Sequence, residues 1–289
     1  MRIAERVKNK KPTLSLEFFP PKEEKNFDKF WSNAAGLGAT DPDFVSITCG
    51  AGGSAQGNTL PVANRLKNDL DFEVMVHQTC VNSTKDDLYN FLDDISQSGI
   101  NNILALRGDE PKESRMNVDN KDFKYASELV NFLKTQNPDL SVAAAAYPGA
   151  HPESESIDDD FYWLKHKVEQ GAEFLHTQFF FDNRQYFDFV DRLNSIGIDC
   201  PVIPGVLPIL SFNSLRFILS VSGTMIPGSL YLNIEKIMHD QGPEAVIEFG
   251  IEFASKQITD LLEKGAPGIH LYTLNRAQPC LQIINNCPF

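Results

Sequence analysis

Charged side chains stand opposite aliphatic ones in short segments of the sequence. Segment 14–20 (LSLEFFP) places Glu17 on the face opposite its leucines, because side chains alternate across a strand. Segment 101–109 (NNILALRGD) likewise places Arg107 and Asp109 opposite its leucines. A buried charge is costly unless it has a partner or a purpose. We therefore interpret these three residues as functional.

Histidines lie on the polar face of other such segments. His176 in 174–181 and His270 in 268–275 fall deeper in their segments than the charged groups do. Because buried polar groups are generally hydrogen-bonded, we expect both to be packed, satisfied residues rather than functional ones.

Eight segments of this kind recur, separated by stretches with helical periodicity. They are 14–20, 44–50, 72–79, 101–109, 141–148, 174–181, 201–208 and 268–275. Alternating strands and helices form a parallel sheet, and eight units favour a closed barrel over an open doubly wound sheet. The first βα turn also lacks the GxGxxG of a dinucleotide-binding open sheet. We predict an α/β fold, a single (β/α)8 TIM barrel spanning 1–289, with its ionisable groups at the C-terminal ends of the strands.

Helix boundaries can also be read from the sequence. Thr84 and Asp87 have the spacing of a capping box, and Gly99 can end the helix that follows. Pro243 and Gly265 bound the last long helix. The interval between the seventh and eighth strands is long enough for an additional helical piece.

Composition excludes several classes of protein. The net charge of −13 argues against binding to nucleic-acid backbones, which needs a positive surface. The charged N-terminus and the absence of a long apolar run predict a cytoplasmic protein with no membrane span. Five scattered cysteines without a CxxC pair predict neither disulfides nor a structural metal site.

Seven stretches, in order, resemble the methylenetetrahydrofolate reductase family. They are SLEFFPPK (15–22), SITCGAGG (46–53), ALRGD (105–109), AAYPGAHPE (145–153), TQFFFD (177–182), IPGVLP (203–208) and YTLNRA (272–277). Together they extend over nearly the whole chain. The resemblance implies a flavoprotein oxidoreductase that reduces 5,10-methylenetetrahydrofolate to 5-methyltetrahydrofolate. FAD would be the cofactor, and NADH or NADPH the electron donor in a ping-pong reaction.

The resemblance also implies catalytic roles. Glu17 matches the general acid that protonates N10 of the folate, so that the resulting 5-iminium cation can accept hydride. Apolar neighbours such as Phe18 and Phe19 favour a protonated carboxyl group, which suits that step. Asp109 matches a residue beside the pterin and the flavin, where a carboxylate stabilises iminium charge.

Further positions match ligand contacts of the family. The FAD contacts are Thr48, His77, Arg107, Gly108, Asp109, Ala126, Tyr147, His151, Asp160 and Lys167. The folate contacts are Asp109, Gln178, Phe212 and Arg276. A guanidinium suits a diphosphate, and a glycine allows close approach of the cofactor.

Two positions depart from the family pattern. Cys49 stands where an aromatic residue is common beside the flavin, and His166 stands where an arginine is common. These departures leave the flavin affinity and the choice between NADH and NADPH open. The sequence also leaves open the direction of the reaction and whether the protein is a homo-oligomer. Because the predicted barrel extends to Phe289, we expect no regulatory domain that binds S-adenosylmethionine.

Two other functions remain as alternatives. A metal-dependent barrel hydrolase or lyase could use His77, His151 and Asp109, although no HxH or HExxH motif is present. A flavin- or folate-binding subunit could instead receive electrons from a partner protein rather than from NAD(P)H.

Overall fold

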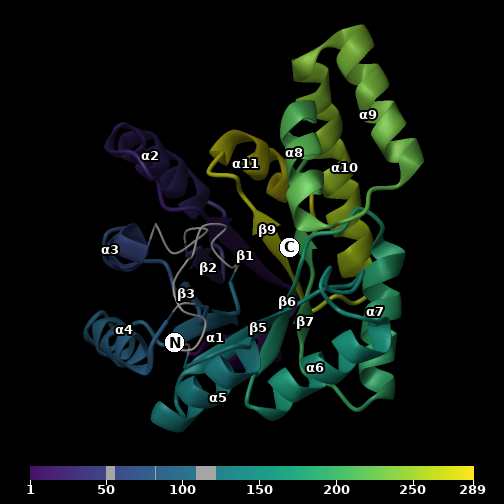
Figure 1. Cartoon of the computed structure of the whole chain (residues 1–289). Helices are drawn as coiled ribbons and strands as arrows, with labels where there is room; N and C mark the ends of the chain where they lie inside the picture. The colour runs from purple at the N-terminus through teal and green to yellow at the C-terminus, as the bar shows by residue number, and fades with distance from the viewer. Residues whose placement is uncertain (50–55, 82, 109–121) are drawn as a thin grey trace, which may run out of the picture.

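Nine parallel strands form the sheet of the computed structural model, which describes residues 1–49, 56–81, 83–108 and 122–289. The strands are β1 (Thr13–Phe18), β2 (Phe44–Ile47), β3 (Val74–Thr79), β4 (Asn102–Leu106), β5 (Ser141–Ala146), β6 (Phe174–Thr177), β7 (Val202–Ile203), β8 (Gly205–Val206) and β9 (Gly268–Tyr272). Their order is β7-β6-β5-β4-β3-β2-β1-β9-β8. Since β7 and β8 follow one another directly in the chain, the two ends of the sheet meet and the barrel closes (Figure 1). The predicted TIM barrel is confirmed.

The seventh predicted strand is divided in two at Pro204. A proline has no N–H to give to a neighbouring strand, so the ladder is interrupted there. β7 pairs with β6 on one side, and β8 pairs with β9 on the other. The carbonyl of Pro204 still accepts a hydrogen bond from the His270 N–H at 2.9 Å. The break therefore replaces one predicted strand with two short ones and leaves the barrel closed.

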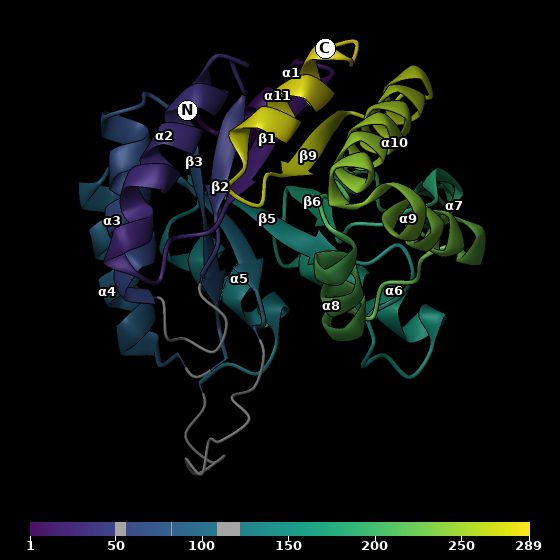
Figure 2. The same ribbon diagram turned by 90° about the horizontal axis from the view of Figure 1, so that it is seen from above.

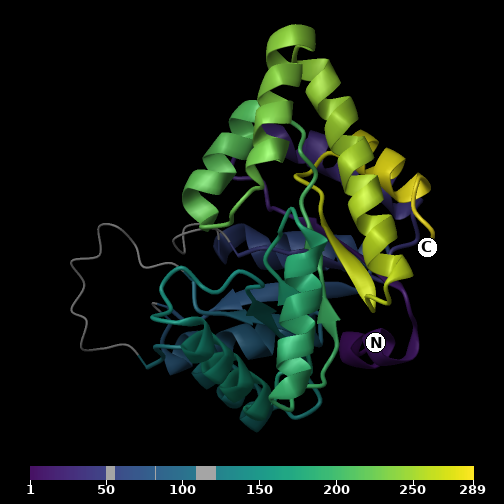
Figure 3. The same cartoon turned by 90° about the vertical axis from the view of Figure 1, so that its right-hand side faces the viewer.

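Helices surround the sheet. They are α2 (Phe27–Gly38), α3 (Gln56–Asn68), α4 (Lys85–Gln97), α5 (Ala126–Gln136), α6 (Ile157–Glu169), α7 (Asn183–Ser195), α10 (Pro243–Glu263) and α11 (Ala277–Asn285), with a 3-10 turn η1 (Glu24–Asn26) before α2. The predicted additional piece consists of α8 (Phe212–Ser222) and α9 (Gly228–Gln241), which with α10 project from one side of the barrel (Figure 3). None of the described helices is both long and apolar enough to cross a membrane.

The predicted helix boundaries hold. Thr84 and Asp87 form the capping box at the start of α4, and Gly99 takes a positive φ just beyond its end.

Gly250 of α10 lies against the chain that follows β8, where an added Cβ would overlap the carbonyl of Ile209. This contact brings α10 close to the barrel wall.

Leucine, valine and isoleucine side chains on the outer face of the sheet pack under the helices. Leu14, Leu16 and Phe18 of β1 belong to this outer core, and Glu17 points into the barrel as its alternation predicts. The alternation in β4 predicts that Leu104 and Leu106, opposite Arg107, lie under the helices. This prediction is wrong, because both leucines face the interior. From Ile103 to Leu106 β4 is apolar on both faces, so alternation gives no signal there.

A short helix that the sequence analysis missed closes the N-terminal end of the barrel. α1 (Ile3–Asn9) buries Ile3, Ala4 and Val7 against the interior residues at that end. The Ile3 N–H donates to Asn102 Oδ1 at 2.8 Å, and the Ala4 N–H donates to Ser141 Oγ at 2.9 Å. Figure 2 shows α1 at one end of the strands and α8 towards the other. Access to the interior is therefore from the C-terminal ends of the strands.

Asp43 ties the end of this helix to the sheet. Its carboxylate accepts hydrogen bonds from Arg6 at 2.6 Å, from Lys10 at 2.7 Å and from the Leu14 N–H at 2.9 Å. Burial alone would raise the pKa of Asp43, but these three donors outweigh it and leave the pKa below its ordinary value.

Candidate functional site

A cavity of about 200 Å³ lies inside the mouth of the barrel. Residues from the predicted strands surround it, namely Glu17, His77, Leu104, Leu106, Ala145, Tyr147, His176, Thr177, Gln178, His270 and Tyr272. Glu17 is only 5% exposed, although it carries an ionisable group. Four residues predicted from the sequence, Glu17, His77, Tyr147 and Gln178, thus meet in one cavity.

Hydrogen bonds connect Glu17 to the floor of this cavity. Glu17 Oε2 lies 3.2 Å from His270 Nε2, and His270 Nδ1 lies 2.9 Å from Ser15 Oγ. Ser15 Oγ also donates to the carbonyl of Ile269 at 3.1 Å. His270 is therefore hydrogen-bonded as predicted, and its partner is the candidate acid itself.

The other two histidines are buried in their neutral form. Burial lowers the pKa of His77 to about 4, against the opposing effect of Glu17, whose Oε2 is 3.6 Å from His77 Nε2. Burial, together with nearby His270 and His77, lowers the pKa of His176 far below its ordinary value. Neither ring nitrogen of His176 has a hydrogen-bond partner among the described residues. The expectation that His176 is a satisfied polar residue is therefore wrong.

A backbone clamp that the sequence analysis did not identify holds Glu17 in place. Thr273 Oγ1 donates to the Glu17 carbonyl at 2.5 Å. Asn275 Nδ2 donates to the Phe19 carbonyl at 2.8 Å, and the Phe19 N–H donates to Asn275 Oδ1 at 3.1 Å. Leu274 and Asn275 both take positive φ angles to make this turn. The YTLN stretch therefore fixes the end of β1.

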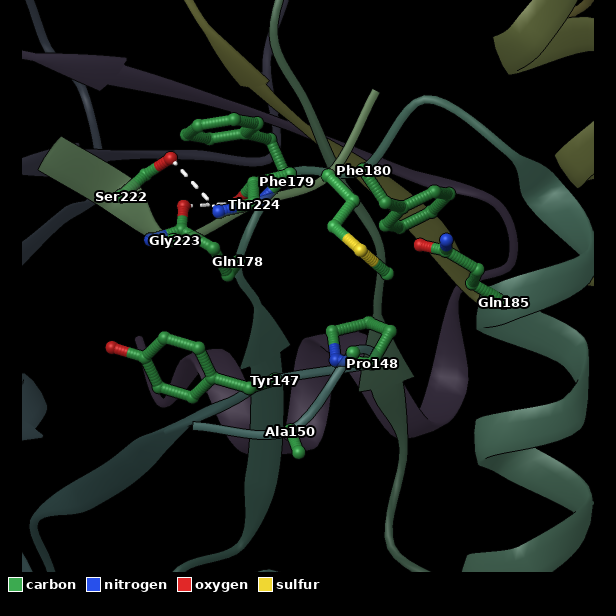
Figure 4. Close-up of a pocket in the computed structure, with 12 residues that line it drawn as sticks. Tyr147, Pro148, Ala150, Gln178, Phe179, Phe180, Gln185, Ser222, Gly223 and Thr224 are labelled. Carbon is green, nitrogen blue, oxygen red and sulfur yellow. Dashed lines mark hydrogen bonds between the residues drawn. The ribbon is translucent and has the colours of Figure 1, made fainter. Parts of the chain in front are cut away.

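A cleft outside the cavity shares two of its residues (Figure 4). Tyr147 and Gln178 line both spaces, so the cleft and the cavity adjoin. The far wall of the cleft comes from the turn after α8, where the Thr224 N–H donates to Ser222 Oγ at 3.2 Å. The Gln178 side chain is held by the backbone of the next residue, since the Phe179 N–H donates to Gln178 Oε1 at 3.1 Å. A flat ligand could extend from the cleft to Glu17.

Charged residues gather at the ends of β4 and β5. Arg107 Nη1 pairs with Glu153 Oε2 at 2.5 Å. Lys167 Nζ donates to the Ala145 carbonyl at 2.7 Å. The His151 N–H donates to Asp160 Oδ2 at 3.2 Å.

Both Lys167 and His151 have pKa values below their ordinary range. Burial of its ammonium group lowers the pKa of Lys167 to about 8, although Asp160 opposes the shift. Burial likewise lowers the pKa of His151, with Glu153 opposing the shift.

These residues fit a flavin dinucleotide. The cations Arg107 and Lys167 suit a diphosphate. The small side chain of Ala145 leaves room for a planar ring inside the cavity, and Gly108 at φ +84° gives a backbone without a Cβ at the end of β4. Ala126 is the first residue of α5, and the dipole at a helix N-terminus favours an anion. Asp109 lies outside the described residues.

The remaining predicted residues line neither the cavity nor the cleft. Thr48 follows β2, and its N–H donates to the Phe18 carbonyl at 3.0 Å. Phe212 begins α8 and packs against Tyr231, with ring centroids 5.5 Å apart. Arg276 is exposed at the start of α11, and Cys49 is half-buried.

Tyr272 is a cavity residue that the sequence analysis did not single out. Its ring meets His270 edge-on at 5.4 Å, and its hydroxyl donates to the Thr177 carbonyl at 3.3 Å.

No group of three or more His, Cys, Asp or Glu side chains among the described residues is arranged to hold a metal ion.

Comparison with known proteins identifies the family. A model of the methylenetetrahydrofolate reductase family matches residues 2–288. The chain belongs to the methylenetetrahydrofolate reductase family. It is 35% identical to 5,10-methylenetetrahydrofolate reductase of Escherichia coli over 265 residues, covering 92% of this chain and 87% of that protein. It is 34% identical to methylenetetrahydrofolate reductase (NADH) 1 of Arabidopsis thaliana over 302 residues, and it spans about half the length of that plant relative.

Solved structures show the same fold at lower sequence identity. An uncharacterised protein from Clostridium thermocellum, which binds two copies of 5-methyl-5,6,7,8-tetrahydrofolic acid, matches with a TM-score of 0.66 and 17% identity. The match covers 98% of this chain and 96% of that one. A dihydropteroate synthase from Xanthomonas albilineans matches with a TM-score of 0.52 and 13% identity, covering 95% and 91% of the two chains. These likenesses support the barrel fold of the family.

Proposed function

We propose that this protein reduces 5,10-methylenetetrahydrofolate to 5-methyltetrahydrofolate, with FAD as cofactor and NADH or NADPH as donor. The barrel would act as one catalytic domain. The observation that supports this most directly is the buried carboxyl group of Glu17 at the floor of a cavity lined by Tyr147 and Gln178. Membership of the family and the reductase names of its relatives agree with it.

The surroundings of Glu17 suit a general acid. With the Ser15 hydroxyl proton directed to the Ile269 carbonyl, His270 Nδ1 carries a proton and donates to Ser15. His270 Nε2 is then an acceptor, and a protonated Glu17 carboxyl group can donate to it. His77 stays neutral near pH 7, so it adds no positive charge that would favour the carboxylate. Glu17 is thus positioned as the group that would pass a proton to the leaving N10.

The other residues would bind and orient the ligands. FAD, when bound, would supply the hydride chemistry. Arg107, Lys167 and the start of α5 would hold its diphosphate and Ala145 would face its ring, with Thr48, Gly108, His151 and Asp160 as further contacts. Gln178, Phe212 and Arg276 would bind the folate, and the same face would receive the nicotinamide of the donor in a ping-pong reaction.

Anaerobic reconstitution tests the proposal. The purified chain loaded with FAD should lose its flavin absorbance on mixing with NADH or NADPH and regain it with 5,10-methylenetetrahydrofolate. A protein that binds no flavin would refute the proposal. Flavin that binds but is bleached by neither nucleotide would instead indicate electron transfer from a partner protein.

A further inference from the structure

Apolar side chains are exposed on α8 and α9, which stand out from the barrel (Figure 3). Phe217 and Val221 are 67% and 66% exposed, and their i, i+4 spacing places them on one side of α8. Met225, in the turn after α8, is 71% exposed, and Leu232 of α9 is 63% exposed. We refer to these four side chains as the α8 face. Tyr162 is the one other large apolar side chain among the described residues that is as exposed.

The outer sides of other helices carry charges where α8 carries apolar groups. A helix at the surface of a protein normally turns polar side chains to solvent. α7 and α10 follow this rule, with exposed i, i+4 ion pairs between Arg192 and Asp188 and between Lys256 and Glu252. Large apolar side chains exposed together are typical of a surface that contacts another molecule. The α8 face is therefore a candidate interaction surface.

The charge of this region differs from that of the rest of the chain. Segment 211–242 extends from the N-cap of α8 to the C-cap of α9. Its charged residues are Arg216, Lys236, Glu235 and Asp240, two of each sign, so its net charge is zero with histidine counted as neutral. The whole surplus of −13 therefore lies elsewhere in the chain. Like charges keep two copies of an acidic protein apart, and the repulsion is weakest where the charges balance. A second copy can thus approach most easily at this segment.

The chemistry of the α8 face favours a contact with itself. Its four side chains contain no nitrogen or oxygen atom that could form a hydrogen bond. Several large apolar side chains are also exposed in the aromatic group of Tyr125, Tyr162 and Trp163, but that group carries two hydroxyls and an indole N–H. When one face meets the same face of a second copy about a two-fold axis, both apolar surfaces are covered and the assembly is closed.

We propose that two copies of this chain associate through the α8 face, with α8 of one copy packed against α8 of the other about a two-fold axis. Met225 also lines the cleft at the barrel mouth. The interface therefore reaches the outer wall of that cleft. This association does not depend on the proposed flavin function.

Measurement of the mass in solution tests the proposal. Size-exclusion chromatography with light scattering, repeated over micromolar concentrations, should give the mass of two chains. Phe217→Glu introduces a charge into both halves of a two-fold interface. The dissociation constant should therefore rise about a hundredfold or more, and the mass should fall to that of one chain. Val221→Lys should have the same effect, because burial of either sign of charge opposes an apolar contact.

Tyr162→Glu is the matched control. Tyr162 is 63% exposed, much like Phe217, but it lies on α6 and outside the α8 face. This variant should keep the mass of two chains. Because Phe217 and Val221 are exposed within the single chain, their variants should keep the circular dichroism spectrum of the parent.

Three outcomes would overturn the proposal. A parent that stays a monomer at every concentration has no such interface, and binding of that monomer to phosphatidylcholine vesicles, if lost in Phe217→Glu, would assign the face to a lipid surface. A dimer that persists in both Phe217→Glu and Val221→Lys would place the interface elsewhere. Equal dissociation of Tyr162→Glu would indicate a general effect of added charge. A chain that forms the dimer but binds no flavin would refute the proposed function and support this association.

Discussion

Replacing the buried carboxyl group of Glu17 with an amide isolates its role as an acid. Glutamine has nearly the same shape, and its amide can donate to His270 Nε2 across the present 3.2 Å contact. The backbone of residue 17 is held independently by Thr273. Glu17→Gln should therefore fold normally, with an unfolding midpoint close to that of the parent.

The cost of the substitution should fall on a single half-reaction. Flavin reduction by NAD(P)H needs no proton from Glu17, so its rate should stay within about twofold of the parent. Loss of a positioned general acid lowers the rate of the step it serves by about 10²–10⁴-fold. Each factor of ten in rate corresponds to about 1.4 kcal/mol of activation free energy, so the substitution should cost about 3–5 kcal/mol of transition-state stabilisation.

Stopped-flow measurements on the anaerobic enzyme separate the two steps. Reduced enzyme is mixed with 5,10-methylenetetrahydrofolate, and the return of flavin absorbance is followed. Glu23→Gln, which changes an exposed carboxylate after β1, is the matched control and should match the parent. If reduced Glu17→Gln enzyme were reoxidised by folate at the parent rate, Glu17 would not be the acid.

Three further predictions concern stability. Gly250→Ala should lower the free energy of unfolding by about 3 kcal/mol or more through overpacking against backbone, whereas Gly228→Ala, which meets open space, should be nearly neutral in denaturant unfolding. His176→Phe should leave stability unchanged or raise it by about 1–2 kcal/mol, because it removes two unpartnered buried nitrogens; a large loss in the same assay would refute this. The pKa of Asp43 is lowered in the folded state, so its stabilising effect should be present above about pH 4 and lost as the pH falls through the folded pKa. Thermal melts of Asp43→Asn between about pH 2 and 5 should show a weaker pH dependence than the parent, and identical profiles would contradict it.

Much of the barrel could be predicted because polar and apolar residues alternate in strands such as β1. The same reasoning failed for β4, where both faces are apolar from Ile103 to Leu106 and only the closed barrel decides which side is inside. It also overlooked the effect of Pro204, whose missing N–H matters only once both neighbouring strands are known. The seven residues of α1 were missed because a helix that short has little intrinsic stability and depends on tertiary contacts.

The candidate site was predicted in part for a similar reason. Glu17 could be chosen because a charge in an apolar strand stands out. His270 could not be connected to it, because the contact joins residues 253 positions apart in the sequence. The clamp from Asn275 to Phe19 spans 256 positions and depends on two positive φ angles that no local pattern indicates.

The helix that closes the bottom of the barrel has a consequence for the order of folding. Ile3 and Ala4 donate backbone hydrogen bonds to Asn102 and Ser141, which lie 99 and 137 positions later in the chain. During synthesis α1 therefore emerges long before its partners exist, and seven residues cannot hold a helix alone. This helix, synthesised before β4 and β5, should therefore be among the last elements of the barrel to become structured. Protection of its amides from hydrogen exchange should appear only after β4 and β5 have paired.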